Sequence, residues 1–171
     1  MAPPKRITVH HEGKEFTGTT LEETLRQVKN IQEFHQRGRK WADIAYHYLI
    51  DPQGNIIEGR PMSLQGAHAG EKNKKGDSPN YANIGISLLG NFDVQKPTDA
   101  QEKSLCTLIG YLESRYGIPN NEIYTHSEIR EKYNIGATGC PGKFLKPVVA
   151  DIRRRGPSLS MARSTSSLGP D

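Results

Sequence analysis

The sequence predicts an α/β fold: a single domain with a central mixed β-sheet flanked by helices. Short apolar segments alternate along the chain with longer segments whose apolar residues recur at helical spacing, and this alternation is typical of the class. The turn sequence DPQG at residues 51–54 joins two of the short segments as a hairpin, which requires an antiparallel pair of strands. A length of 171 residues fits one domain with a core of its own.

Five segments have the length and apolar content of strands, at residues 5–10, 44–50, 55–59, 83–90 and 123–125. The second of them, IAYHYLI, is almost continuously apolar, which indicates a buried strand. The first ends near the pair His10–His11, and the last ends directly before His126. The polar, Gly- and Lys-rich residues 66–79 are expected to form a loop.

The predicted helices span residues 21–36, 98–116 and 141–155. The first follows a threonine N-cap, and its expected core-facing residues are Leu21, Leu25, Val28, Ile31 and Phe34. The second is closed by Gly117 and Pro119. Residues 127–139 are expected to be irregular, with room for one helical turn. The Ser-, Gly- and Pro-rich residues 156–171 are expected to be a disordered tail or a linker.

A formal net charge of +4 and an isoelectric point of about 9.1 favour anionic partners, such as nucleic acid, anionic glycopolymers or membrane surfaces. The dense basic runs are residues 72–76 and 153–155, and solvated surface charge accounts for them equally well. No run approaches the roughly 20 apolar residues of a membrane helix, so we expect no membrane insertion. The first residues, MAPPKRITVHHEG, contain no apolar h-region, so we expect no signal peptide and synthesis in a cytoplasm.

Three candidates for a metal site stand at strand ends or just beyond them: His10 or His11, His126 and Cys140. Two imidazoles and one thiolate are good ligands for zinc, and three protein ligands leave a fourth position open for catalysis. The chain has no short H-x-x-x-H or C-x-x-C pair, so spacing alone leaves surface or core roles open for these residues. Cys106, in a segment with helical periodicity, is expected to be a small core residue.

The segment WADIAYHYLIDPQGNIIEGRP, residues 41–61, resembles a signature of the type 2 family of zinc-dependent N-acetylmuramoyl-L-alanine amidases. That family includes the phage lysozyme amidases, which are endolysins, and the peptidoglycan recognition proteins. Further matching pieces occur in the family's order: TVHHE, IQEFHQRGRKW, GAHAG, NIGISLLGNF, YTHSEI and ATGCPG. The resemblance spans residues 5–155 and implies that residues 1–155 form an amidase domain with the family's fold.

The resemblance implies a Zn²⁺ cofactor whose protein ligands are His10, His126 and Cys140. The family uses the first histidine of the pair. The strand pattern agrees, because Ile7 and Val9 share a face with His11 and mark the packed side, which leaves His10 on the open side. His11 is then expected to form hydrogen bonds behind the site.

Two residues match catalytic positions of the family. Tyr46 matches its active-site tyrosine, whose phenol can hydrogen-bond the attacking water or the developing oxyanion. Thr138 matches a position that is threonine in peptidoglycan recognition proteins and lysine in phage lysozymes, and it can donate a hydrogen bond to the tetrahedral intermediate. His68 and Asn83 are expected to line the substrate groove or its floor.

Other positions distinguish branches of the family. Ser87 stands where the branch that recycles muropeptides has glutamate, so no carboxylate base is evident. Cys140 stands where that branch has aspartate, which favours the lysozyme-like branch. His126 and Cys140 are fourteen positions apart, further than in many relatives, and the insertion around residues 131–136 is expected to loop out beside the site. The remaining matching histidines, expected to be structural, are His35 and His47.

The implied function is hydrolysis of the amide between N-acetylmuramic acid and the L-alanine of the stem peptide, as in a bacteriolytic endolysin. The implied partner is bacterial peptidoglycan rather than nucleic acid, and we expect a monomer. A chain made in the host cytoplasm would act at the bacterial cell wall after release through a holin or a similar route. Three alternatives stay open: a recognition module that binds peptidoglycan without cutting it, a cytoplasmic amidase that recycles muropeptides, and a structural zinc protein.

Overall fold

The computed structural model describes residues 2–156, and a five-stranded sheet forms its centre. Its strands are β1 (Arg6–His11), β2 (Tyr48–Ile50), β3 (Ile56–Glu58), β4 (Asn83–Leu88) and β5 (Ile123–Thr125). They lie in the order β3-β2-β4-β1-β5. β1 is parallel to both β4 and β5, β2 is parallel to β4, and β2 and β3 form the antiparallel hairpin. The predicted α/β class with a mixed sheet is confirmed.

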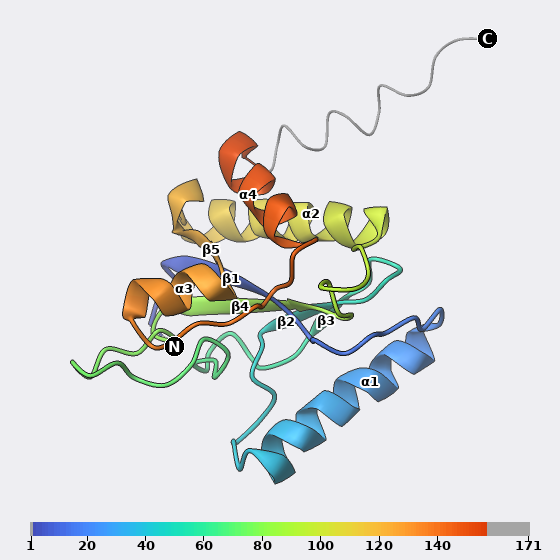
Figure 1. Cartoon of the computed structure of the whole chain (residues 1–171), viewed down its shortest axis with the longest axis horizontal. Helices are drawn as coiled ribbons and strands as arrows, with labels where there is room; N and C mark the ends of the chain where they lie inside the picture. Colours follow the sequence, from blue (N-terminus) through green and yellow to red (C-terminus); the bar gives the residue numbers. More distant parts are fainter. Residues whose placement is uncertain (1, 157–171) are drawn as a thin grey trace.

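Helices cover both faces of this sheet (Figure 1). They are α1 (Leu21–Glu33), α2 (Asp99–Tyr116), α3 (His126–Tyr133) and α4 (Lys146–Arg155), with the π-helical turn η1 (Phe34–Gly38) and the 3₁₀ turn η2 (Asn120–Glu122). α2 and α4 lie on one face and α1 lies on the other. None of the helices in residues 2–156 has the length and apolar content needed to cross a membrane.

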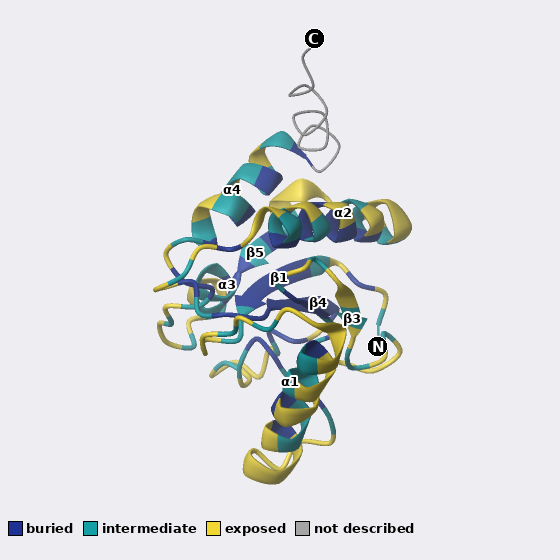
Figure 2. Ribbon diagram, turned by 90° about the vertical axis from the view of Figure 1, so that its right-hand side faces the viewer, coloured by how far each residue is buried: buried dark blue, intermediate teal, exposed yellow. Residues whose placement is uncertain are grey.

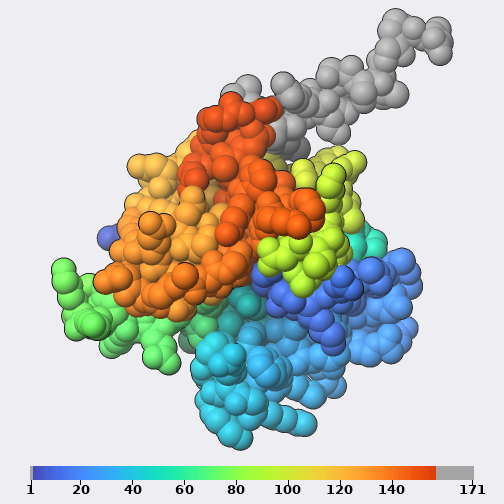
Figure 3. Space-filling model, viewed as in Figure 1, coloured from blue at the N-terminus to red at the C-terminus, as the bar shows by residue number. Residues whose placement is uncertain are grey.

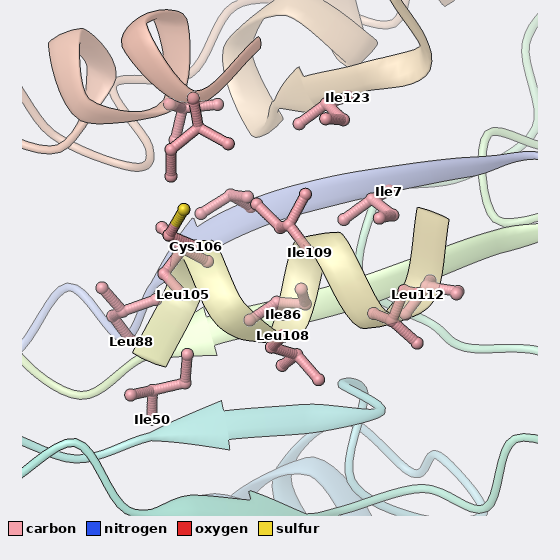
Figure 4. Packing of buried hydrophobic residues seen from close by; sticks show 14 of the residues in the cluster. Ile7, Ile50, Ile86, Leu88, Leu105, Cys106, Leu108, Ile109, Leu112 and Ile123 are labelled. Atoms are coloured by element: carbon pink, nitrogen blue, oxygen red, sulfur yellow. The ribbon is translucent and has the colours of Figure 1, made fainter. Parts of the chain in front are cut away.

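The main core lies between the sheet and the pair α2 and α4. Alternate residues of β1, Ile7 and Val9, are fully buried there, and they pack with Leu105, Ile109 and Leu112 of α2 (Figure 4). A smaller cluster on the opposite side joins α1 to the sheet and contains Ile31, Ile44, Leu49 and Leu89. Thr8 and His10, on the other face of β1 from Ile7 and Val9, therefore face away from the main core.

α1 buries only part of the predicted face, because Ile31 and Val28 pack against the sheet but the other predicted residues do not. Leu21, Leu25 and Phe34 are 54%, 50% and 57% exposed, whereas Thr24 and Ile31 are buried. The Thr24 hydroxyl donates a hydrogen bond of 2.7 Å to the buried Asp51 carboxylate in the β2–β3 turn, which rotates the threonine side of the helix toward the sheet. Figure 2 shows α1 projecting from the sheet with much of its surface exposed.

Two predicted boundaries also differ from the structure. The predicted strand at residues 44–50 is regular only over β2. Before β2, the Ala45 carbonyl accepts a hydrogen bond from the Ala67 N–H, and the His47 N–H donates one to the Gly85 carbonyl. The predicted third helix begins at Lys146 instead of residue 141, after a turn closed by the Gly142 N–H on the Gly139 carbonyl.

Residues 127–139, predicted to be irregular, contain most of helix α3. Thr125 and Glu128 form a capping box at its start, and this T-x-x-E pattern is visible in the sequence. The inserted residues 131–136 continue α3 and then turn at Asn134, which adopts a left-handed conformation. The predicted tail, residues 156–171, lies outside the described residues except for Gly156, which ends α4.

The two leucines Leu112 and Leu25 provide a test of this packing. Leu112 is fully buried, so Leu112→Ala should lower the free energy of unfolding by about 2–5 kcal/mol. Leu25→Ala removes the same atoms from a half-exposed site and should change it by less than about 0.5 kcal/mol. Denaturant unfolding of both variants measures the difference, and equal losses would contradict the orientation of α1.

Candidate functional site

The carboxyl ends of β1 and β5 bring two histidines together. The strands are parallel neighbours with Val9 opposite Thr125, so the residues that follow lie at the same edge of the sheet. His10 is the next residue on β1, and His126 is the first residue of α3 directly after β5. Their ring centroids are 4.5 Å apart.

A loop from the C-terminal part of the chain adds Cys140. The Ser127 N–H at the start of α3 donates a 3.0 Å hydrogen bond to the Cys140 carbonyl, which anchors the loop beside His126. The Cys140 Sγ atom lies 3.8 Å from His10 Nδ1. Ligand atoms of His10, His126 and Cys140 all lie within 4.8 Å of one another. Ligands of one tetrahedral zinc ion are about 3.3–3.8 Å apart, so this spacing requires only a small contraction.

A relay of hydrogen bonds orients His10. His68 Nε2 lies 3.2 Å from the Asn83 carbonyl, which can only accept, so this nitrogen carries the His68 proton. His68 Nδ1 is then an acceptor, and His10 Nε2, at 2.9 Å, must donate to it. The lone pair of His10 is therefore on Nδ1, the atom that faces Cys140 Sγ. Histidines that bind metals generally donate their other ring N–H to a neighbouring acceptor, which fixes the tautomer and the ring orientation.

The electrostatic state of the three side chains suits a cation. Burial lowers the pKa of His10 well below its ordinary value and lowers the pKa of His126 to about 4, so both rings are neutral at neutral pH. Burial raises the pKa of the Cys140 thiol to about 12. His126 Nε2 is buried and has no hydrogen-bond partner within residues 2–156. A divalent ion would satisfy this nitrogen and favour the thiolate, so the residues fit Zn²⁺.

A groove of about 550 Å³ opens beside these residues. One wall comes from α1 and the turn after it, including Gln27, Phe34 and Trp41, and the other side contains Tyr46, His68 and His126. In the space-filling view of Figure 3, the blue, cyan and orange parts of the chain meet around this region. Exposed aromatic rings next to polar side chains are typical of sites for small polar ligands.

Tyr46 stands at the edge of the groove next to His10, with ring centroids 5.2 Å apart. Burial and the nearby Cys140 raise its pKa above the ordinary value of tyrosine, so the phenol stays protonated and can donate a hydrogen bond. The Thr138 hydroxyl accepts a hydrogen bond of 3.3 Å from the Cys140 N–H and retains its own proton for another acceptor. The structure therefore places both predicted catalytic residues next to metal-ligand candidates.

Of the two predicted groove residues, one lines the groove and the other does not. His68 lines the groove but is 6% exposed, and both of its ring nitrogens take part in the relay to His10. Asn83 is fully buried, and its side chain bonds to Thr8 and to the Pro79 carbonyl. A substrate in the groove cannot reach an amide that is buried and already paired, so the prediction for Asn83 as a substrate-binding residue is wrong.

Glu12 is a groove residue that the sequence analysis did not consider. Burial raises the pKa of its carboxyl to about 7, and one oxygen, Oε2, is buried without a hydrogen-bond partner among the described residues. The other oxygen accepts a hydrogen bond from Gln27 of α1. Its position two residues after His10, on the same face of an extended chain, is the sequence signal that indicates this placement.

The other histidines support the surrounding backbone. His11 Nδ1 accepts a 3.2 Å hydrogen bond from the Phe92 N–H, as expected for a residue behind the site. His47 Nδ1 accepts from the Gly85 N–H, and its Nε2 bonds to the Leu64 carbonyl. His35 Nδ1 accepts from the Ala45 N–H, and its ring lies 5.1 Å from that of Trp41.

Comparison with known families identifies the family to which the chain belongs. The profile of the family described as N-acetylmuramoyl-L-alanine amidase matches residues 1–143. The chain belongs to the N-acetylmuramoyl-L-alanine amidase family. The matched range contains the three metal-ligand candidates and Tyr46.

Relatives of this chain include peptidoglycan recognition proteins and an N-acetylmuramoyl-L-alanine amidase. Peptidoglycan-recognition protein SC2 of Drosophila simulans is 36% identical over 78% of the chain, and the match spans 66% of that relative's length. The amidase LysC from Clostridium intestinale URNW superposes with a TM-score of 0.67 at 28% identity, covering 88% of the chain and 85% of LysC.

A third relative was solved with a ligand. A mutant of Drosophila peptidoglycan-recognition protein LB in complex with tracheal cytotoxin superposes with a TM-score of 0.70 at 25% identity. The match covers 89% of the chain and 81% of that protein. Amidases and recognition proteins therefore share the fold of this amidase domain.

The relay predicts the tautomers of three histidines in the metal-free amidase domain. His10, His68 and His47 should each carry their proton on Nε2, because each Nδ1 faces a donor or the metal-ligand candidates. Nitrogen NMR of the imidazole rings at neutral pH distinguishes the two tautomers directly. A proton on Nδ1 of His68 would reverse the relay and contradict the orientation of His10.

Proposed function

We propose that this chain is a zinc-dependent N-acetylmuramoyl-L-alanine amidase that cleaves the amide between N-acetylmuramic acid and the L-alanine of the peptidoglycan stem peptide. One observation carries the proposal: ligand atoms of His10, His126 and Cys140 lie within 4.8 Å of one another, and His126 also lines the groove. Two neutral imidazoles and a cysteine match the three protein ligands of a catalytic zinc site, which leaves a fourth position for water or substrate.

The proposed ligands are the three side chains that the sequence analysis names. Zinc bound there would supply a Lewis acid that polarises the amide carbonyl and lowers the pKa of water toward about 7. His68 would hold the His10 ring so that Nδ1 stays aimed at the ion. His11 would hold the backbone behind Cys140, because its carbonyl oxygen lies 4.0 Å from the cysteine sulfur.

Tyr46 and Thr138 would act on the reacting amide. Water adds to the carbonyl carbon, the C–N bond breaks, and the products are a lactyl carboxylate and the amino group of L-alanine. The protonated Tyr46 phenol would donate a hydrogen bond to the carbonyl oxygen as it gains negative charge, and Thr138 would donate a second one. The groove would position the glycan and the peptide on either side of the scissile bond.

The names of the relatives support the substrate class. One structural relative is named as an N-acetylmuramoyl-L-alanine amidase, and another was solved with tracheal cytotoxin. A further one is named as an endolysin amidase from Clostridium intestinale, which supports a bacteriolytic role at the bacterial cell wall. The amidase would act there as a monomer.

Two other functions compete with this proposal. Many relatives are named as recognition proteins, so a module that binds peptidoglycan without cutting it is the main competitor. The complete set of metal-ligand candidates together with Tyr46 favours catalysis over recognition alone. A muropeptide-recycling amidase is the second competitor, and Cys140 together with the buried Ser87 disfavours it.

The chain contains two cysteines, which form a matched pair for a test. Cys140→Ala removes a proposed zinc ligand, so release of peptides with a new N-terminal alanine from purified peptidoglycan should fall by at least about 100-fold. Cys106→Ala changes a buried residue of the main core and should retain activity within about threefold. Chromatography of released muropeptides, with end-group labelling of alanine, measures both rates.

The metal dependence is tested on the same assay. A chelator should abolish release by the unmodified chain, and added Zn²⁺ should restore it. Binding to peptidoglycan without any release at saturating zinc would support the recognition module instead. Full activity of Cys140→Ala would contradict its assignment as a ligand.

A further inference from the structure

A second large depression lies outside the groove. It has a volume of about 970 Å³ and lies between the long β3–β4 connection and the end of α3. We call it the basic cavity, and its charged and aromatic lining is Lys72, Lys74, Lys75, Lys132, Tyr81 and Tyr133. Figure 3 shows the green part of the chain, which carries the first three lysines, beside the orange helix α3.

The charge of the basic cavity is largely uncompensated. Lys72, Lys74 and Lys75 form no ion pair with any residue in the described part of the chain. Asp77 is the acidic residue in the lining, and its carboxylate accepts a hydrogen bond from the Asn73 side chain. Lys132 forms an ion pair with Glu122, with 3.5 Å between Nζ and Oε1. The depression therefore presents three ammonium groups that a solvated anion can approach.

The lysines are carried by a structured turn. Asn73 Oδ1 accepts hydrogen bonds of 2.9 Å from the N–H groups of both Lys75 and Asp77. The Asn73 N–H donates to the Asp77 carbonyl, and the Gly76 N–H donates to the Asn73 carbonyl. These bonds fix the backbone from which the lysines project, so less backbone entropy is lost when an anion binds.

Residues close together in the sequence line the basic cavity and the groove. Gln65 lines the basic cavity, whereas Ala67 and His68, two and three residues later, line the groove. A polymer attached to a glycan in the groove could therefore extend across the lysines. All cations that line the basic cavity are lysines, which bind phosphates as point charges, and it contains none of the arginine forks that read base edges in nucleic acids.

We propose that the basic cavity binds an anionic glycopolymer of the bacterial wall whose repeating units are joined by phosphodiesters. The inference rests on the proposed function, because peptidoglycan is the matrix to which such polymers are attached. Binding there would retain the amidase on its substrate between cleavage events. Because exposed charges interact through water, the interaction would weaken as ionic strength rises.

The test compares two triple variants of the full chain. Lys72→Gln, Lys74→Gln and Lys75→Gln together change the basic cavity. Lys29→Gln, Lys96→Gln and Lys103→Gln change three exposed lysines elsewhere, and each set lowers the formal net charge from +4 to +1 (4 − 3 = 1). Affinity for soluble poly(glycerol phosphate), free of peptidoglycan, is measured by calorimetry at low and moderate salt.

The cavity variant should lose at least about tenfold in affinity at low salt, and the control less than about threefold. Equal losses would overturn the proposal, since net charge alone would then explain binding. Tighter binding of duplex DNA or of phosphatidylglycerol vesicles, at equal phosphate concentration, would overturn the choice of partner. No measurable binding of the polymer by the unmodified chain would also overturn it.

A separate measurement keeps this proposal distinct from the proposed function. Both triple variants should cleave a small muropeptide that carries no phosphodiester at the rate of the unmodified chain. If none of the proteins cleaves it, the proposed amidase activity fails, while the polymer affinities still decide the role of the basic cavity. A slower rate in the cavity variant alone would overturn its separation from catalysis.

Discussion

The parallel pairing of β1 with β5 is the constraint on which the site depends. It aligns Val9 with Thr125, so that His10 and His126 emerge at the same edge of the sheet although they are far apart in sequence. The capping box at Thr125 starts α3 at His126, and the Ser127 N–H then holds the Cys140 carbonyl. The β1–β5 register, the start of α3 and the hydrogen bond to Cys140 together place the three side chains side by side. A shift in the β1–β5 register would separate His10 from His126 and Cys140.

Burial then determines the chemistry of this point. The histidines are neutral, and the relay through His68 to the Asn83 carbonyl leaves His10 Nδ1 as the available lone pair. The Cys140 thiol has a pKa raised to about 12, so only a cation at the site favours its thiolate at neutral pH. Tyr46 presents an uncharged donor to the groove, whereas the basic cavity presents exposed ammonium groups. The buried metal-ligand candidates and the exposed lysines therefore lie in separate environments.

The α/β class and the five strands were predictable because apolar periodicity is a local signal. The set of His10, His126 and Cys140 was predictable only through the resemblance of the ordered motifs to a known family. The sequence did not predict that Leu25 is exposed, because the orientation of α1 depends on the Thr24–Asp51 hydrogen bond between distant segments. The burial of Asn83 and the role of His68 as a partner of His10 also depend on contacts across the sheet. The start of α3 was predictable, because Thr125 and Glu128 form the T-x-x-E pattern of a capping box in the sequence.

X-ray absorption at the zinc edge, on the purified chain loaded with one equivalent of Zn²⁺, would show directly whether His10, His126 and Cys140 bind the ion. We expect two nitrogen ligands at about 2.0–2.1 Å, one sulfur ligand at about 2.3 Å and one further light atom. The sulfur contribution should vanish in Cys140→Ala and persist in Cys106→Ala. A shell of oxygen and nitrogen atoms without sulfur, or a sulfur shell that survives Cys140→Ala, would contradict this ligand assignment.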